Sequence, residues 1–378
     1  LPFLVKDLKY IVNLLYATLY KLFGVLLSMI HHRKIIVVYT LHVYKRGDKM
    51  AQLREKHIHN KLKDLEDFLL EQYKEQAKQK DKDYALYEKE FKQRFRKAMD
   101  NLNPLIEDAS LRLKFYRARG DKPSLKVEQR LRLLLLSQLA GKSNRMMAYM
   151  TRLFSLLTGI NRSYKTIERL YSDPETGAAL FNLWISTLKK KKVKEVDVCG
   201  DATGFGLFIS KHYSSYAKKL KDKAKDSKNT KKAFVYKFSL MDLKTKMYIC
   251  FGTSLISEAK AFHKAMEMLE ELDIKIKSVR LDRYYSFPCY AKLFPGAKFY
   301  VIPRTDSKPA GGTEWLNAMR SFVWDTMKHL EEYFRRNNSE SYFGGDKKMF
   351  GWNVRQKRDD RIDTALFCRD IWHNLFRL

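Results

Sequence analysis

The sequence lacks closely spaced cysteines. Its 378 residues include four cysteines, at positions 199, 250, 289 and 368, and no two of them form a C-x-x-C pair. This spacing argues against a zinc ribbon, and a disulfide scaffold is not typical of a chain of this length. A reducing compartment is the simpler interpretation, so we expect a cytoplasmic protein.

Negative charge is also scarce. The chain has 43 Asp plus Glu against 74 Lys plus Arg, a formal net charge of +31. This balance disfavours an acidic enzyme of small-molecule metabolism and predicts a polyanionic partner, either a nucleic acid or an anionic membrane surface. A hydrophobic content of 45%, with 13% aromatic residues, is ample for buried cores and excludes global disorder. The length predicts about two or three domains.

The one long apolar run lies near the N-terminus, where residues 10–30 contain Lys21 as their only charged side chain. Taken alone, this run is a candidate membrane span. The residues 45–50, KRGDKM, are compatible with purine-rich codons of a ribosome-binding sequence in front of a start codon. We therefore expect translation to start at Met50, residues 1–49 to be translated upstream DNA, and no functional membrane association. A genuine membrane anchor is the alternative.

In the N-terminal half of the chain after Met50, apolar residues recur at helical spacing. Residues 50–121 are predicted to be a helical region, and residues 122–190 a helix-turn-helix-like DNA-binding region. Its last helix, residues 164–170, would be capped by Ser163 and would pack Ile167 and Leu170 inward. The side chains offered to a major groove would be Ser163, Tyr164, Lys165, Thr166 and Arg169. A three-helix cluster without DNA contact is the alternative.

Two lysine-rich stretches follow, residues 189–194 and 218–232. They are either solvated linkers or sites of nonspecific phosphate contact, and the second role would make DNA binding strongly dependent on salt.

The pattern changes from helical to strand-like after residue 194. The predicted order is β-β-β-α-β-α-β, which is the order of the RNase H-like fold, so residues 195–378 are predicted to be an α/β domain with a mixed sheet flanked by helices. The strands of this order are 196–201, 233–240, 246–253, 274–282 and 298–302, and its helices are 258–272 and 290–294; residues 207–209 are a further short strand candidate.

Two of these strands are predicted to end at an aspartate, Asp201 and Asp282. Neighbouring strands would bring the two carboxylates together, where they repel each other unless a cation lies between them. Hard oxygen ligands suit Mg²⁺ or Mn²⁺, and a pair of such ions can activate water and stabilise the leaving oxygen in phosphodiester cleavage.

A third element follows in the spacing Y-x2-R-x3-E-x6-K, formed by Tyr333, Arg336, Glu340 and Lys347. On one continuous helix these four positions would share a single face. A carboxylate flanked by two cations and a ring suits a metal site that holds a phosphate chain. Gly344-Gly345 is expected to interrupt this helix, so that Lys347 would reach the site from a loop.

Together these segments resemble the DDE transposases of prokaryotic insertion sequences that carry the YREK motif. The resemblance covers about residues 196–378 and rests on four stretches in order: Gly200 to Gly204, Leu281 to Ser286, the Y-x2-R-x3-E-x6-K run, and Asp360 to Leu375. It implies that Asp201, Asp282 and Glu340 are catalytic and bind two Mg²⁺ or Mn²⁺ ions, and that Tyr333, Arg336 and Lys347 contact the DNA phosphates. It also implies a homodimer that acts on double-stranded DNA, cleaving terminal inverted repeats and joining them to target DNA.

Two other functions are open at this stage: a metal-dependent nuclease on the same fold, and a catalytically inactive DNA-binding regulator derived from a transposase. Only 57 residues separate Asp282 from Glu340. This interval leaves open whether ends are released through a hairpin. Trp315 and Trp324 lie within it and are expected in the core, with base stacking as the alternative role.

Overall fold

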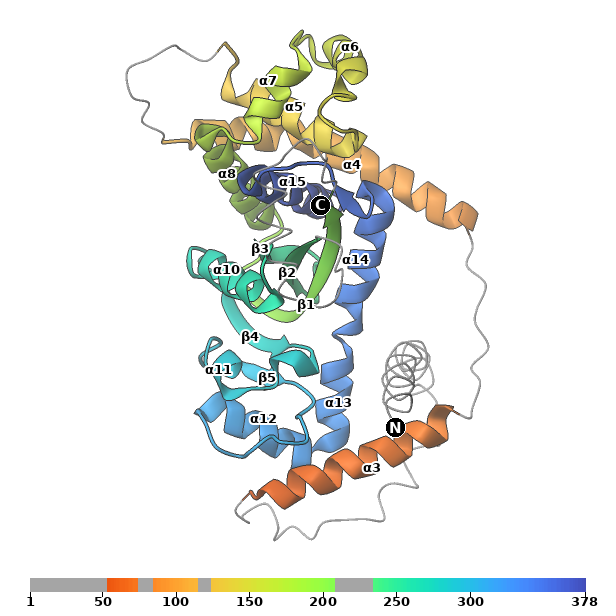
Figure 1. Ribbon diagram of the computed structural model, residues 1–378, viewed down its shortest axis with the longest axis vertical. Coiled ribbons are helices and arrows are strands. Elements are labelled where there is room, and N and C mark those ends of the chain that lie inside the picture. The colour runs from red at the N-terminus through yellow and green to blue at the C-terminus, as the bar shows by residue number, and fades with distance from the viewer. Residues whose placement is uncertain (1–52, 74–83, 115–123, 208–233) are drawn as a thin grey trace, which may run out of the picture. The chain divides into compact units, whose positions relative to one another are not determined.

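The computed structural model describes residues 53–73, 84–114, 124–207 and 234–378 (Figure 1). The expectations for residues 1–49 and for the lysine-rich residues 218–232 lie outside the described residues. Within the described ranges, no helix is both long and apolar enough to cross a membrane.

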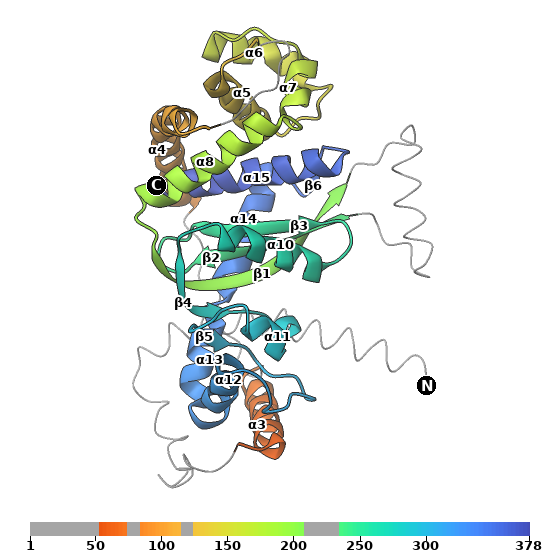
Figure 2. The ribbon, with the colours of Figure 1, turned by 90° about the vertical axis from the view of Figure 1, so that its left-hand side faces the viewer.

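The described chain divides into two compact units (Figures 1 and 2). Unit 1 contains the helix α3 and residues Ser278–Asn337, and unit 2 contains Tyr84–Lys277 and Asn338–Leu378. The chain thus passes from unit 2 to unit 1 within the strand β4 and returns at the start of the helix α14.

Unit 1 is built on short strands covered by helices. Its elements are α3 (Glu55–Tyr73), the end of β4 (Lys275–Arg280), the 3₁₀ helix η2 (Arg283–Tyr285), α11 (Pro288–Ala291), β5 (Lys298–Tyr300), α12 (Thr313–Trp324) and α13 (Thr326–Phe334). β4 and β5 are parallel, α12 packs against β5 and α3, and α13 packs against α12. Trp315 and Phe322 of α12 are buried in this core, so the expected core position of Trp315 is confirmed, whereas Trp324 is only half-buried.

Unit 2 combines a helical region with an antiparallel sheet. Its helices are α4 (Tyr84–Leu111), α5 (Val127–Ala140), α6 (Met147–Thr158), α7 (Tyr164–Leu170), α8 (Pro174–Lys190), α10 (Glu258–Glu270), α14 (Asn337–Phe350) and α15 (Asp359–Leu375). Its strands are β1 (Glu195–Leu207), β2 (Phe234–Asp242), β3 (Tyr248–Ser254), the start of β4, and β6 (Asn353–Val354). The expected helical region is therefore present in front of the first strand.

The strand order is β3-β2-β1-β4-β5, with β6 pairing in parallel with the end of β1. β1, β2 and β3 are antiparallel neighbours, and β4 begins beside β1, where Lys275 N donates to Lys194 O over 2.8 Å. A helical N-terminal half followed by a mixed sheet with flanking helices confirms the predicted α/β class, and the strand order is consistent with an RNase H-like fold.

The first strand differs from the prediction. β1 is a single strand from Glu195 to Leu207, so Asp201 lies in its middle and not at its end. β2 pairs with β1 without a break from Val198 to Gly206, and this ladder outweighs the low strand propensity of the glycines within it.

Helices cover both faces of this sheet in unit 2 (Figure 2). α10 approaches β3 so closely that a Cβ atom on Gly252 would lie 2.1 Å from Ala261 O. On the opposite face, the preceding residue Phe251 contacts Trp184 of α8 and Phe367 of α15. Trp184 Nε1 also donates to Ile249 O over 3.0 Å, which fixes α8 to β3.

Candidate active site

The structure brings three of the predicted site residues together within unit 1. Asp282 follows β4 and caps η2: its Oδ1 accepts from Arg283 N over 2.7 Å, and its backbone carbonyl accepts from Tyr285 N over 2.9 Å. Arg336 Nη2 lies 3.9 Å from Asp282 Oδ1, and its guanidinium carbon lies 5.8 Å from the centre of the Tyr333 ring. Arg336 is 1% exposed, whereas the Asp282 side chain is 38% exposed, so the carboxylate faces solvent with an arginine behind it.

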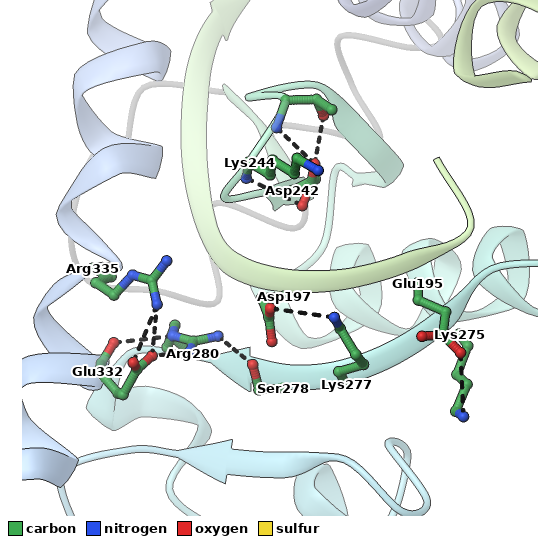
Figure 3. Close-up of polar contacts among 11 residues, drawn as sticks. Glu195, Asp197, Asp242, Lys244, Lys275, Lys277, Ser278, Arg280, Glu332 and Arg335 are labelled. Carbon is green, nitrogen blue, oxygen red and sulfur yellow. Dashed lines mark hydrogen bonds and ion pairs between the residues drawn. The ribbon is translucent and has the colours of Figure 1, made fainter. Parts of the chain in front are cut away.

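A buried arginine fixes the turn that carries Arg336 (Figure 3). Arg280, at the end of β4, donates from Nε to Glu332 O over 3.0 Å and from Nη1 to Ser278 Oγ over 2.7 Å. Its Nη2 also pairs with the Glu332 carboxylate, which receives a second ion pair from Arg335 at 3.0 Å. Partial burial raises the pKa of Glu332, but the hydrogen bonds and charges of the two arginines outweigh it and lower the pKa.

This clamp between β4 and α13 was not predicted. The sequence contains one indication of it: Arg280 lies between the apolar residues Val279 and Leu281 at a strand end, and a buried arginine needs an acidic partner.

The predicted continuous helix over Tyr333, Arg336 and Glu340 is wrong. α13 ends at Phe334, Arg335 and Arg336 form a turn in which Arg336 N donates to Tyr333 O over 3.0 Å, and α14 begins at Asn337. The expected interruption at Gly344-Gly345 is also wrong, because α14 continues through both glycines to Phe350. Lys347 therefore projects from a helix, seven residues after Glu340 and on the same side of it.

Asp201, Glu340 and Lys347 belong to unit 2. Asp201 Oδ1 accepts from Ala202 N over 2.9 Å, and its side chain leaves the same face of β1 as Phe205, four residues later. Lys347 Nζ lies 5.2 Å from the centre of the Phe205 ring. Burial, and secondarily the charge of Lys237, lowers the pKa of Lys347.

α14 runs in the same direction as β1. Its first turn reaches the hairpin between β2 and β3, where Lys246 Nζ donates to Asn338 Oδ1 over 3.2 Å, and the chain after it pairs with β1 at Gly206. Lys347 of α14 contacts Phe205 of β1. Glu340 lies about 10 Å before Lys347 along α14, and Asp201 lies about 13 Å before Phe205 along β1. Because α14 and β1 run side by side in the same direction, we expect the carboxylates of Asp201 and Glu340 to lie at similar positions along these two elements.

A buried polar network that sequence reasoning missed holds α14 in place. Asp346 of α14 lies 2.9 Å from His373 Nδ1 of α15 and accepts from Tyr248 Oη over 2.7 Å. Burial raises the pKa of Asp346, but the charge and hydrogen bond of His373, with Lys237 and Tyr248, more than offset it and lower the pKa. Lys237 of β2 forms a second buried pair, with Asp370 of α15. Because these partners come from distant segments, no local spacing in the sequence reveals them.

The predicted recognition helix has the predicted local structure. α7 spans Tyr164–Leu170, Ser163 is its N-cap with Oγ accepting from Thr166 N over 3.4 Å, and Ile167 and Leu170 are buried. Lys165 and Arg169, one turn apart, are exposed, and Tyr164 and Thr166 are partly buried. Contact of these side chains with DNA stays a prediction.

Side-chain bonds join this helical region to the C-terminal segment of unit 2. Arg361 of α15 pairs with Glu168 of α7 and donates from Nε to Ser172 Oγ over 2.9 Å. Asn144, in front of α6, exchanges two amide hydrogen bonds with Gln356, of 2.8 and 3.0 Å. The predicted recognition helix is therefore fixed to the segment that follows α14 and β6.

In the described part of the chain, no three His, Cys, Asp or Glu side chains lie close enough together to hold an ion. Asp282 belongs to unit 1, and Asp201 and Glu340 belong to unit 2. All three are partly exposed, and their oxygen donors suit Mg²⁺ or Mn²⁺ chemically. The donor set thus fits the implied ions.

Comparison with known proteins gives one clear relative. No family model and no solved structure matches the chain. The chain is 38% identical over 315 residues to the "Probable transposase for insertion sequence element ISA1214" of Archaeoglobus fulgidus, a match that covers 82% of this chain and 93% of that relative. Identity at this level over nearly the whole relative shows that the chain belongs to the transposases of insertion sequences.

Proposed function

We propose that this protein catalyses DNA transposition on an RNase H-like domain, cutting the ends of an insertion sequence and joining them to target DNA. The contacts of Arg336 with Asp282 and with the ring of Tyr333 carry the proposal. These side chains lie about fifty residues apart in the chain, were predicted to act in one site, and meet in unit 1. The family relationship points to the same activity.

Each of the three carboxylates is positioned by different neighbouring groups. Asp282 is oriented by Arg283 N and by the neighbouring Arg336, and Asp201 by Ala202 N. Glu340 is carried by α14, whose position the Asp346–His373 pair fixes. We propose that Asp201, Asp282 and Glu340 bind two Mg²⁺ or Mn²⁺ ions, which when bound activate the attacking oxygen and stabilise the leaving oxygen of the phosphodiester.

The basic side chains would hold the DNA. Arg336 lies beside Asp282 and Tyr333 in unit 1, and Lys347 lies on the same helix as Glu340 in unit 2. We propose that Tyr333, Arg336 and Lys347 contact the phosphates near the scissile bond. Lys165 and Arg169 of α7 would read the major groove of the inverted repeats. The active form is proposed to be a homodimer bound to double-stranded DNA in the cytoplasm.

Replacement of one carboxylate tests this proposal. In Asp282→Asn the side chain keeps its shape and loses the charge that a metal ion needs, so Mg²⁺-dependent cleavage of DNA carrying the element's ends should fall by more than roughly 100-fold. Binding of the same DNA, measured by fluorescence anisotropy, should stay within about twofold.

The matched control is Asp306→Asn, which removes one acidic charge from an exposed ion pair of unit 1 and should leave cleavage unchanged. Cleavage by Asp282→Asn at the wild-type rate would contradict the proposed metal site. Cleavage without joining would favour the nuclease, and binding without cleavage by the wild type would favour the inactive regulator.

A further inference from the structure

Trp352 is the most exposed tryptophan of the described chain. Its side chain lies in the short segment between α14 and β6 and is 61% exposed, whereas Trp184, Trp315 and Trp372 are buried. Singly exposed apolar side chains are common on protein surfaces, so the exposure of Trp352 indicates a role only together with its fixed backbone and its neighbours.

The segment that presents this ring is held on both sides. Gly206 N of β1 donates to Trp352 O over 3.1 Å, and the buried Arg369 donates to Gly351 O over 3.2 Å and to Asn353 O over 2.9 Å. Gly351 has φ +85°, a left-handed conformation that turns the chain outward at little cost for glycine. The backbone of Trp352 is therefore fixed while its ring faces solvent.

The ring also lies next to a predicted site residue. Lys347 Nζ is 5.0 Å from the centre of the Trp352 ring and 5.2 Å from the centre of the Phe205 ring, so the cation contacts both aromatic rings. The residues around Trp352 are polar or charged where exposed, including Asn353 and Arg355. A single flat ring beside a cation suits a nucleobase joined to a phosphate better than it suits an apolar protein surface.

We propose that Trp352 is a stacking platform for an unpaired base of the bound DNA, with Lys347 contacting the adjoining phosphate. The proposal rests on the proposed function in one respect: as a transposase, the protein would take the unpaired base from the end of the element that is opened for cleavage. The stacking itself needs only a single-stranded base next to duplex DNA, so it can be measured without catalysis.

The test compares the full-length chain and its variants on two probes, a blunt duplex and the same duplex with a 3′ tail of about six thymidines. Anisotropy titrations without metal give the gain in affinity that the tail confers. We expect the wild type to bind the tailed probe more tightly, and Trp352→Ala to lose roughly 5- to 100-fold of that gain while binding the blunt duplex almost as the wild type does. Trp352→Phe should keep most of the gain because a smaller ring still stacks.

Tyr84→Ala is the matched control, since it removes a ring of α4 that is 76% exposed, and it should keep the full gain. Equal gains for Trp352→Ala and the wild type, no gain for the wild type, or an equal loss on both probes would each overturn the proposal. Failure of the transposase proposal gives a different result, in which the wild type retains the tail-dependent gain and cleaves no DNA when Mg²⁺ is added.

Discussion

At the scale of single residues, His329 of α13 shows how burial sets a protonation state in unit 1. The imidazole is fully buried between the rings of Tyr300 and Phe322, and its Nε2 lies 3.0 Å from Val301 O. Burial lowers the pKa of His329 to about 4, although the hydrogen bond to Val301 opposes the shift. The ring is thus neutral at physiological pH and serves to pack α13 onto the strands.

This burial predicts a loss of stability in mild acid. The unfolded chain takes up a proton near pH 6.5, whereas the folded chain does so only near pH 4, so the free energy of unfolding should fall as pH decreases from 6.5 to 4. The contribution of this residue is roughly 3 kcal/mol over the full range, of which about 2 kcal/mol is lost between pH 7 and pH 5. Urea unfolding of the wild type and of His329→Phe at pH 7 and pH 5 measures it, and an equal pH dependence in both proteins would contradict the assignment.

A second residue-scale prediction concerns Gly252 of β3. A methyl group there would meet the backbone of α10 at Ala261 O and Ala265 N, and the helix would have to move. Gly252→Ala should therefore destabilise the protein by about 1–3 kcal/mol, as overpacking does in other cores. Thermal unfolding measures this effect, and an unchanged midpoint would show that α10 does not lie so close to the strand.

At the scale of elements, the continuous helix α14 makes the opposite prediction for Gly345. A Cβ atom on this glycine meets nothing within 4 Å, so Gly345→Ala should stabilise the helix by about 0.5–1 kcal/mol. If the helix were broken at Gly344-Gly345, as the sequence predicted, the same change would be neutral or destabilising. Thermal unfolding of this variant beside Gly252→Ala distinguishes the two cases.

The recognition helix α7 is the second element with a measurable role. Lys165→Ala and Arg169→Ala should each weaken binding to the element's ends by roughly 1–3 kcal/mol if the side chain contacts a base. Lys142→Ala, which removes an exposed cation before α6, is the matched control and should change binding by less. A footprint identical to that of the wild type would assign α7 to structure alone.

Most elements could be predicted from the sequence because their determinants are local. The cap Ser163, the inward Ile167 and Leu170, and the order of strands and helices after residue 194 depend on spacing along the chain. The length of β1, the turn at Arg335-Arg336 and the buried Asp346–His373 pair depend on partners from distant segments, which one sequence does not reveal. The site prediction is accordingly strongest for Asp282, Arg336 and Tyr333, which the structure brings together.

At the scale of the whole molecule, we propose separate roles for the net charge of +31 and for the three carboxylates. The charge would draw the protein to DNA of any sequence, and the three carboxylates would confine chemistry to one site. DNA binding should therefore weaken steeply as salt rises, by a similar factor in the wild type and in Asp282→Asn. Anisotropy titrations over a range of NaCl concentrations measure this slope, and a slope near zero would contradict a phosphate-dominated interface.

Sequencing the products formed from donor DNA with the element's ends, target DNA and Mg²⁺ tests the transposase proposal most directly. We predict that the wild type joins the 3′ ends of the element to target DNA, that Asp201→Asn, Asp282→Asn and Glu340→Gln each abolish this joining, and that all three variants still bind the ends. Joined products from any of the three variants, or cut ends that the wild type never joins, would contradict the proposal.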